Sequence, residues 1–246
     1  MKRFVHFAIL ALMTSASIAQ ELKPMAYADG TQKLNGLVTD NTEVKRPGVL
    51  LLPAWMGIDE EARIAALELA RQGYIVFTAD IYGEGNVPSD GAAAKRIATH
   101  YKTDFAAYQH RITVALEQLK LAGADAEKLA VIGYCFGGTG ALEAARANMP
   151  VKGVASIHGG LGKGDRPNGP LNTSILIEHP EADPTVSKTD MESIVSEMNE
   201  AKADWQMTTY AHCGHTFTNP ASKDYNKRMA ERAWRHLLVF LEEVLR

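Results

Sequence analysis

Short apolar runs alternate with longer segments of helical periodicity along most of this chain. The predicted strands are the runs at 49–52, 74–79, 129–132, 153–157, 174–178 and 206–210. The predicted helices lie at 60–72, 104–122, 189–203 and 221–245. Runs that are apolar on both faces are typical of parallel strands covered by helices. The alternation therefore predicts the α/β class, with a doubly wound, mostly parallel sheet flanked by helices.

The breaks between these elements carry local boundary signals. Asp59 can cap the helix that follows it, and Gly73 ends that helix. A long helical region in the middle of the chain is interrupted near Thr103. Residues 20 to 45 are polar and turn-rich, and within them we expect an edge strand at 32–39, followed by a turn at Asp40-Asn41.

The first residues follow a different pattern. Met1-Lys2-Arg3 is basic, 4–13 is apolar, and Ser17-Ile18-Ala19 places small residues where a signal peptidase reads them. We therefore expect a Sec-type signal peptide at 1–19, cleaved after Ala19, and a single domain at 20–246. The apolar run is too short to span a bilayer comfortably, so we expect no stable membrane insertion after cleavage. The expected location is periplasmic or secreted.

Composition narrows the class of partner. The chain has 246 residues, of which 46% are hydrophobic, and this is enough for one large domain with a buried core. Its formal net charge of -3 gives no reason to expect nucleic acid or an anionic membrane as a partner. We expect a monomer that acts on a small molecule without a cofactor.

One glycine-rich stretch carries the strongest chemical signal. The predicted strand 129–132 leads into Gly133-Tyr134-Cys135-Phe136-Gly137-Gly138, and a helical pattern follows. This strand, turn and helix is the context of a G-x-S-x-G nucleophile elbow, with Cys in place of Ser. Side chains at Gly133 and Gly137 would clash, and the tight turn would lift Sγ of Cys135 above the sheet beside a helix N-terminus. The alternative is a glycine-rich turn with a buried, inert cysteine.

This motif resembles the elbow of the dienelactone hydrolase family, a cysteine branch of the α/β-hydrolases. The resemblance extends from about Gly48 to the C-terminal helix. It implies the α/β-hydrolase fold and the hydrolysis of carboxylic esters or lactones through an acyl-thioester intermediate.

A thiol nucleophile needs a base and an acid that orients the base, and in this fold they follow the nucleophile in the order acid, then base. Asp183 follows the predicted strand 174–178, and His215 follows the strand 206–210. Both loops resemble the acid and base motifs of the family, so Cys135, Asp183 and His215 form the predicted triad. The competing groups in the same loops are Glu178, Glu181 and Asp190 for the acid and His212 for the base.

The resemblance also implies an oxyanion hole and a substrate pocket. The backbone amides of Phe136 and Trp55 would hold the oxyanion. A fairly apolar pocket would be lined by aromatic and apolar side chains, with one arginine as a further candidate. The pocket candidates are Trp55, Met56, Tyr82, Arg96, Phe136 and Phe217.

Two positions depart from the best-known branch of the family. That branch has a Glu just before the second oxyanion amide, where this chain has Ala54, and an Arg four residues beyond the catalytic His, where this chain has Asn219. The scaffold and the triad therefore carry over, while the dienelactone substrate does not follow.

Three alternatives remain at this stage. A metal site built from His158, His179, His212 and His215 lacks helical H-x-x-x-H spacing, and we expect no metal. Cys135 and Cys213 form an even pair in an exported chain, which is compatible with a structural or a reversible disulfide. A non-catalytic or redox-responsive binding protein on the same fold is the rival function.

Overall fold

The computed structural model describes residues 21–39 and 44–246, and within them eight strands form one sheet. The strands are β1 (Leu22–Asp29), β2 (Gln32–Thr39), β3 (Arg46–Leu52), β4 (Ile75–Thr78), β5 (Ala124–Tyr134), β6 (Gly153–Ile157), β7 (Ser174–Pro180) and β8 (Trp205–Tyr210). Their order is β1-β2-β4-β3-β5-β6-β7-β8. β2 pairs antiparallel with β1 and β4, and every other pairing is parallel, as the sequence predicts.

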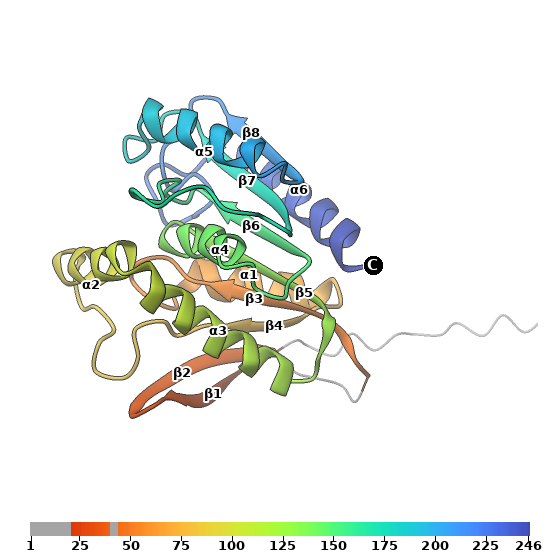
Figure 1. Ribbon diagram of the computed structural model, residues 1–246. Helices are drawn as coiled ribbons and strands as arrows, with labels where there is room; N and C mark the ends of the chain where they lie inside the picture. Colours follow the sequence, from red (N-terminus) through yellow and green to blue (C-terminus); the bar gives the residue numbers. More distant parts are fainter. Residues whose placement is uncertain (1–20, 40–43) are drawn as a thin grey trace, which may run out of the picture.

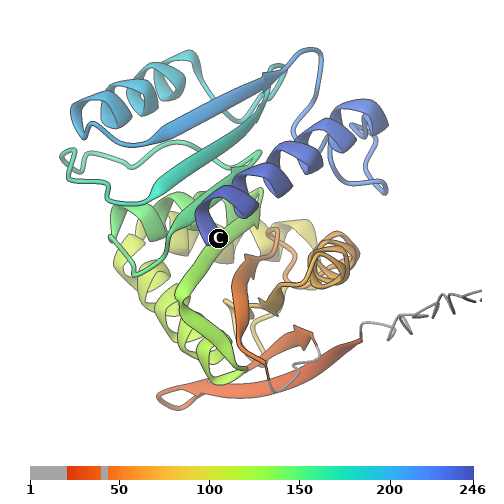
Figure 2. The same ribbon diagram turned by 90° about the vertical axis from the view of Figure 1, so that its right-hand side faces the viewer.

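Helices cover both faces of this sheet (Figure 1). They are α1 (Glu60–Arg71), α2 (Gly91–Thr103), α3 (Phe105–Leu121), α4 (Phe136–Arg146), α5 (Lys188–Glu200) and α6 (Lys227–Leu245). The turned view shows α1 and α6 on one side of the sheet and α3, α4 and α5 on the other (Figure 2). The prediction of a doubly wound sheet between helical layers is confirmed.

The two cores follow from the two-residue period of the strands. Leu50 and Leu52 of β3 point to the face of α3, α4 and α5, while Val49 and Leu51 point to the face of α1 and α6. All four side chains are fully buried, which is why β3 reads as a continuous apolar run rather than an alternating one.

Several predicted boundaries match the structure closely. Asp59 accepts a hydrogen bond from the Ala62 N–H at the start of α1, and Gly73 follows the end of that helix with φ of +98°. The predicted break near Thr103 separates α2 from α3, where Asp104 caps the second helix.

Other predictions miss. β1 was not expected, because its alternating half-exposed positions resemble a polar loop; it pairs with β2 along its whole length. The last helix begins at Lys227 rather than at 221, because Asn226 caps it and donates its own N–H to the Phe217 carbonyl. The signal peptide at 1–19 and the turn at Asp40-Asn41 lie outside the described residues, and they stay predictions, as does the monomeric state.

In the described ranges, every helix is too short or too polar to cross a bilayer.

The parallel strands β5 to β8 bring their carboxyl ends to one edge of the sheet. Cys135 directly follows β5, His158 directly follows β6, and Asp183 and His215 lie in the loops after β7 and β8. Side chains far apart in sequence therefore gather at a single edge, which is where α/β sheets bind ligands.

Candidate active site

The turn between β5 and α4 holds Cys135 in a sparsely populated backbone conformation, with φ of 54° and ψ of -111°. Glycines on both sides make this possible. A Cβ on Gly133 would lie 2.1 Å from the Gly137 carbonyl oxygen, and a Cβ on Gly137 would lie 2.0 Å from the carbonyl oxygen of Leu52. Both distances are far below van der Waals contact, so only glycine fits at either position, as the sequence motif predicts.

The thiol of Cys135 lies in hydrogen-bond contact with an imidazole, and that imidazole contacts a carboxylate. Nε2 of His215 is 3.0 Å from Sγ of Cys135, and Nδ1 of the same ring is 2.6 Å from Oδ2 of Asp183. The structure thus brings together the three side chains that the sequence nominates for a triad.

The charges in this set are coupled. Burial opposes a charge on His215, but the hydrogen bonds to Asp183 and Cys135 outweigh it and raise the pKa of the imidazole to about 10. Burial also opposes ionisation of Asp183, yet hydrogen bonds from His215 and from the backbone and side chain of Thr185 lower its pKa to about 2. At neutral pH the ring is therefore an imidazolium beside a carboxylate.

The competing groups that the sequence also offers do not reach the ring. The side chain of His212 is 95% exposed, and its backbone N–H donates to Glu181. Asp190 is used in the capping box at the start of α5 with Ser187. Glu178 is fully buried in β7, and its Oε1 lies 3.9 Å from Nδ1 of His236 in α6.

The two amides proposed for the oxyanion hole belong to residues whose carbonyl groups are held by tyrosines. The Tyr82 hydroxyl donates to the Trp55 carbonyl, and the Tyr108 hydroxyl donates to the Phe136 carbonyl, both at 2.9 Å. Phe136 is the first residue of α4, so its N–H precedes the hydrogen-bond ladder of the helix. Its ring stacks on Tyr108 with a centroid distance of 4.6 Å. These contacts hold the carbonyl side of both residues, whereas the N–H of each belongs to the preceding peptide unit.

The predicted pocket side chains lie in different environments. Phe217 is 0% exposed and packs with Tyr210 and Cys213 in the core. Tyr82 is also buried and acts through its hydroxyl. Met56 is half-buried in the loop after β3, and Arg96 is exposed on α2 without a hydrogen bond or ion pair to any described residue.

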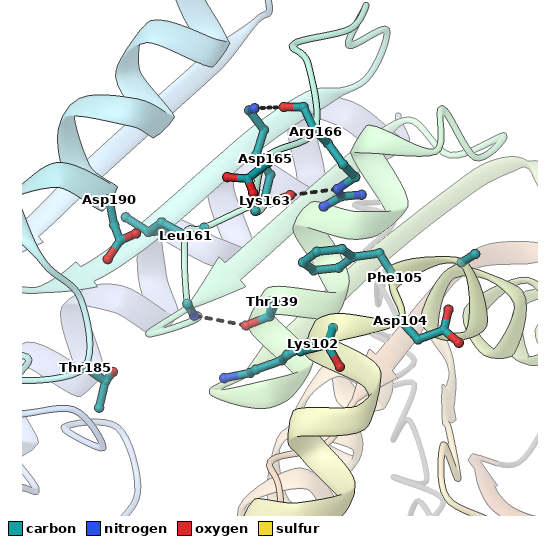
Figure 3. Close-up of a pocket in the computed structure, with 15 residues that line it drawn as sticks. Lys102, Asp104, Phe105, Thr139, Leu161, Lys163, Asp165, Arg166, Thr185 and Asp190 are labelled. Carbon is teal, nitrogen blue, oxygen red and sulfur yellow. Dashed lines mark hydrogen bonds between the residues drawn. The ribbon is translucent and has the colours of Figure 1, made fainter.

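A cavity of about 1050 Å³ adjoins the Asp183 side of the site (Figure 3). Thr139 and Thr185 connect it to the triad, because Thr139 donates its N–H to the Cys135 carbonyl and Thr185 donates to Asp183. Nine of its fifteen described lining residues are polar or charged, and none of the six predicted pocket residues is among them. The charged lining residues are Lys102, Asp104, Lys163, Asp165, Arg166 and Asp190.

Most charges of this cavity are already used by the fold. Asp104 caps α3 and Asp190 caps α5, while Arg166 binds Glu143 and stacks over the ring of Phe105. Lys102 makes no ion pair within the described residues, and its amine points into the cavity in Figure 3.

His158 is a buried neighbour of the triad that the sequence suggested only as a metal ligand. Its Nδ1 accepts a hydrogen bond from the Cys135 N–H at 3.1 Å, and its ring centroid lies 5.4 Å from that of His215. Its place directly after a strand on the same edge was the available signal.

Both cysteines of the described chain are free thiols, and Cys213 is buried behind Phe217. Among residues 21–39 and 44–246 there is no cluster of His, Cys, Asp and Glu that could hold a metal ion.

The comparisons with known proteins agree with this geometry. The family described as "Dienelactone hydrolase family" matches residues 34–245. The chain belongs to the dienelactone hydrolase family. It is therefore a hydrolase of the dienelactone hydrolase type, on an α/β-hydrolase fold.

Individual relatives cover nearly all of the chain. A Bradyrhizobium protein named "Probable 2-oxo-3-(5-oxofuran-2-ylidene)propanoate lactonase" is 25% identical over 240 residues, which is 91% of this chain and 96% of the other. The crystal structure of a dienelactone hydrolase-like promiscuous phosphotriesterase from metagenomic libraries superposes with a TM-score of 0.85 at 29% identity, over 93% of this chain and 100% of that one. The family match thus includes the elbow and the strands β3 to β8.

Proposed function

We propose that the protein hydrolyses carboxylic esters or lactones through Cys135, His215 and Asp183 and an acyl-thioester intermediate. The observation that carries this proposal is the continuous contact from Asp183 through His215 to the sulfur of Cys135, at 2.6 and 3.0 Å. The thiolate is the reactive form of cysteine, and an adjacent imidazolium favours it.

The proposed reaction proceeds by acylation of Cys135 and then hydrolysis of the thioester. The thiolate of Cys135 attacks the substrate carbonyl, and the amides of Trp55 and Phe136 bind the resulting oxyanion. The imidazolium of His215 gives its proton to the leaving alkoxide, which departs as an alcohol and leaves the thioester. His215 then takes a proton from water as that water attacks the thioester carbonyl, and the carboxylic product leaves with regeneration of the thiolate. Asp183 holds the ring orientation throughout.

The cavity favours substrates that carry an acid group. Lys102 is the cation of this cavity that the fold does not engage, and the name of the Bradyrhizobium relative denotes a lactone bearing a propanoate. An ester or lactone with a carboxylate is therefore the proposed substrate class, with Lys102 as the binding partner of that carboxylate.

The test compares the wild-type protein with Cys135→Ala and with the matched control Cys213→Ser, which changes the other, buried thiol. Turnover is measured with an aryl acetate and with an aryl ester of a dicarboxylic acid. We expect Cys135→Ala to lose about 10³-fold or more in turnover of both esters, Cys213→Ser to keep wild-type turnover, and the acidic ester to have the lower KM. Equal rates for wild type and Cys135→Ala would end the proposal.

A further inference from the structure

A second chain of hydrogen-bonded side chains reaches Cys135, through its backbone N–H rather than its sulfur. The Cys135 N–H, which also donates to the Ile157 carbonyl at 3.0 Å, donates to Nδ1 of His158 at 3.1 Å. Nε2 of His158 lies 2.8 Å from Oγ1 of Thr218, and the Thr218 hydroxyl donates to Oε1 of Glu61 at 2.7 Å. The chain thus connects the elbow to α1 through two loops.

The direction of these hydrogen bonds is set by the state of the ring. Burial, followed by the nearby charge of His215, lowers the pKa of His158 to about 3, so the imidazole is neutral. Because Nδ1 accepts from the Cys135 amide, the proton of the neutral ring is on Nε2 and is donated to Thr218. Thr218 therefore accepts from His158 and donates to Glu61, and its hydroxyl is fully used.

We propose that Glu61, Thr218 and His158 are positioning residues, which hold Cys135 and the loop of His215 in the geometry where sulfur and imidazole meet. This inference rests on the proposed hydrolase function, and it assigns the three side chains no contact with substrate.

The backbone at Cys135 and at His158 needs such support. Cys135 and His158 have φ values of 54° and 42°, a region that side-chain-bearing residues rarely adopt and that persists only when neighbouring contacts hold it. The hydrogen bond between them joins the two strained turns after β5 and β6.

Thr218 also anchors the loop that carries His215. It lies three residues after His215 in the segment between β8 and α6, so its two hydrogen bonds anchor this segment to β6 and to α1. Loss of the hydroxyl would leave a buried N–H of His158 and a buried carboxyl of Glu61 without partners, and both the elbow and the loop would relax.

Glu61 needs only to accept a hydrogen bond in this arrangement. It lines a cavity of about 550 Å³ between α1 and α6, and a carboxyl oxygen accepts from Thr218 in the ionised and in the neutral form. An amide oxygen can do the same, so Glu61→Gln is a conservative change, whereas Glu61→Met removes the acceptor.

The experiment compares Thr218→Val, which keeps the shape, with Thr218→Ser, which keeps the hydroxyl. The matched control is Thr173→Val, because Thr173 is buried, more so than the half-buried Thr218, and its hydroxyl donates to the Val151 carbonyl at the opposite edge of the sheet. Two readouts are taken for each protein: kcat and KM for an aryl ester, and the pH profile of iodoacetamide alkylation at Cys135, followed by mass spectrometry of its peptide.

We expect Thr218→Val to lower kcat about tenfold with KM nearly unchanged, and to lower the alkylation rate below pH 7 by a similar factor. Thr218→Ser should restore both within about threefold, and Thr173→Val should leave both unchanged. If Thr218→Val does not fold by circular dichroism, the pair Glu61→Met and Glu61→Gln supplies the same contrast.

The proposal is overturned if Thr218→Val behaves as wild type, if Thr218→Ser is as impaired as Thr218→Val, or if Thr173→Val causes the same loss. The alkylation readout needs no turnover. If the protein hydrolyses no ester, the proposed function is wrong. The alkylation rates of Cys135 would still decide whether Thr218 has the positioning role.

Discussion

Two hydrogen-bonded chains, each with a carboxyl group and a histidine, meet at Cys135, and their histidines differ in charge. In the first, Asp183 contacts His215 directly, and the ring reaches the sulfur. In the second, the hydroxyl of Thr218 separates Glu61 from His158, which reaches the amide of Cys135. The pKa of His215 is raised to about 10, whereas that of His158 is lowered to about 3.

The two carboxyl groups differ in the same way. Hydrogen bonds from His215 and Thr185 overcome burial and lower the pKa of Asp183 to about 2. Burial dominates at Glu61, where Thr218 offers a single hydrogen bond, and raises the pKa to about 7. Burial alone favours neutral groups, and it is the direct contact between ring and carboxylate that makes a buried pair ionise. The chain of Asp183 and His215 is therefore charged, whereas the chain of Glu61, Thr218 and His158 is suited to a positioning role.

The largest expected effect comes from exchanging each histidine for glutamine. His215→Gln should lower kcat/KM for an aryl ester by about 10³-fold to 10⁴-fold, because proton transfer is lost. His158→Gln retains a group that can accept from the Cys135 N–H and should lower it only about tenfold. Steady-state kinetics of both variants check this difference, and equal losses would remove the distinction between the two chains.

The carboxyl groups should differ in a second test. Asp183→Asn removes the charge that orients and stabilises the imidazolium, and should lower kcat about 10²-fold or more. Glu61→Gln keeps the acceptor for Thr218 and should stay within about threefold of wild type. Steady-state kinetics of both variants at pH 7 measure this difference. A loss of kcat in Glu61→Gln as large as that in Asp183→Asn would mean that the charge of Glu61 is needed.

A smaller effect concerns stability. The folded pKa of Glu61, about 7, lies above its ordinary value of 4.5, so the folded protein holds a proton that the unfolded chain releases. The contribution of Glu61 to stability therefore falls as pH rises between 4.5 and 7. Relative to wild type, Glu61→Gln should gain on the order of 1–3 kcal/mol in free energy of unfolding between pH 4 and pH 8.

Urea denaturation at the two pH values measures this gain, and Glu60→Gln, on the exposed side of the same helix, is the matched control with no expected change. A wild-type-like pH dependence in Glu61→Gln would show that this carboxyl does not titrate as described.

Much of this arrangement was predictable from sequence because it depends on local patterns. The glycines around Cys135 predict a turn that only glycine permits. A Cβ at Gly133 or Gly137 would clash with neighbouring backbone, as the motif predicts. The order of strands then brings Asp183 and His215 to the same edge, since parallel strands end together.

The remaining features depend on packing between distant segments. Phe217 reads as a pocket aromatic by its place beside His215, yet its side chain turns into the core with Tyr210. The Glu61 contact with Thr218 joins residues 157 positions apart, and no local spacing announces it. The cavity beside Thr185 likewise forms from the start of α3 and the loop after β6, which approach only in the folded chain.

The charge states of the two histidines test the account most directly. Nitrogen-15 NMR of the imidazole rings at pH 7, assigned with the His158→Gln and His215→Gln variants, reports which nitrogens carry protons. The account predicts a doubly protonated His215 and a neutral His158 with its proton on Nε2. A neutral His215, or a charged His158, would contradict it.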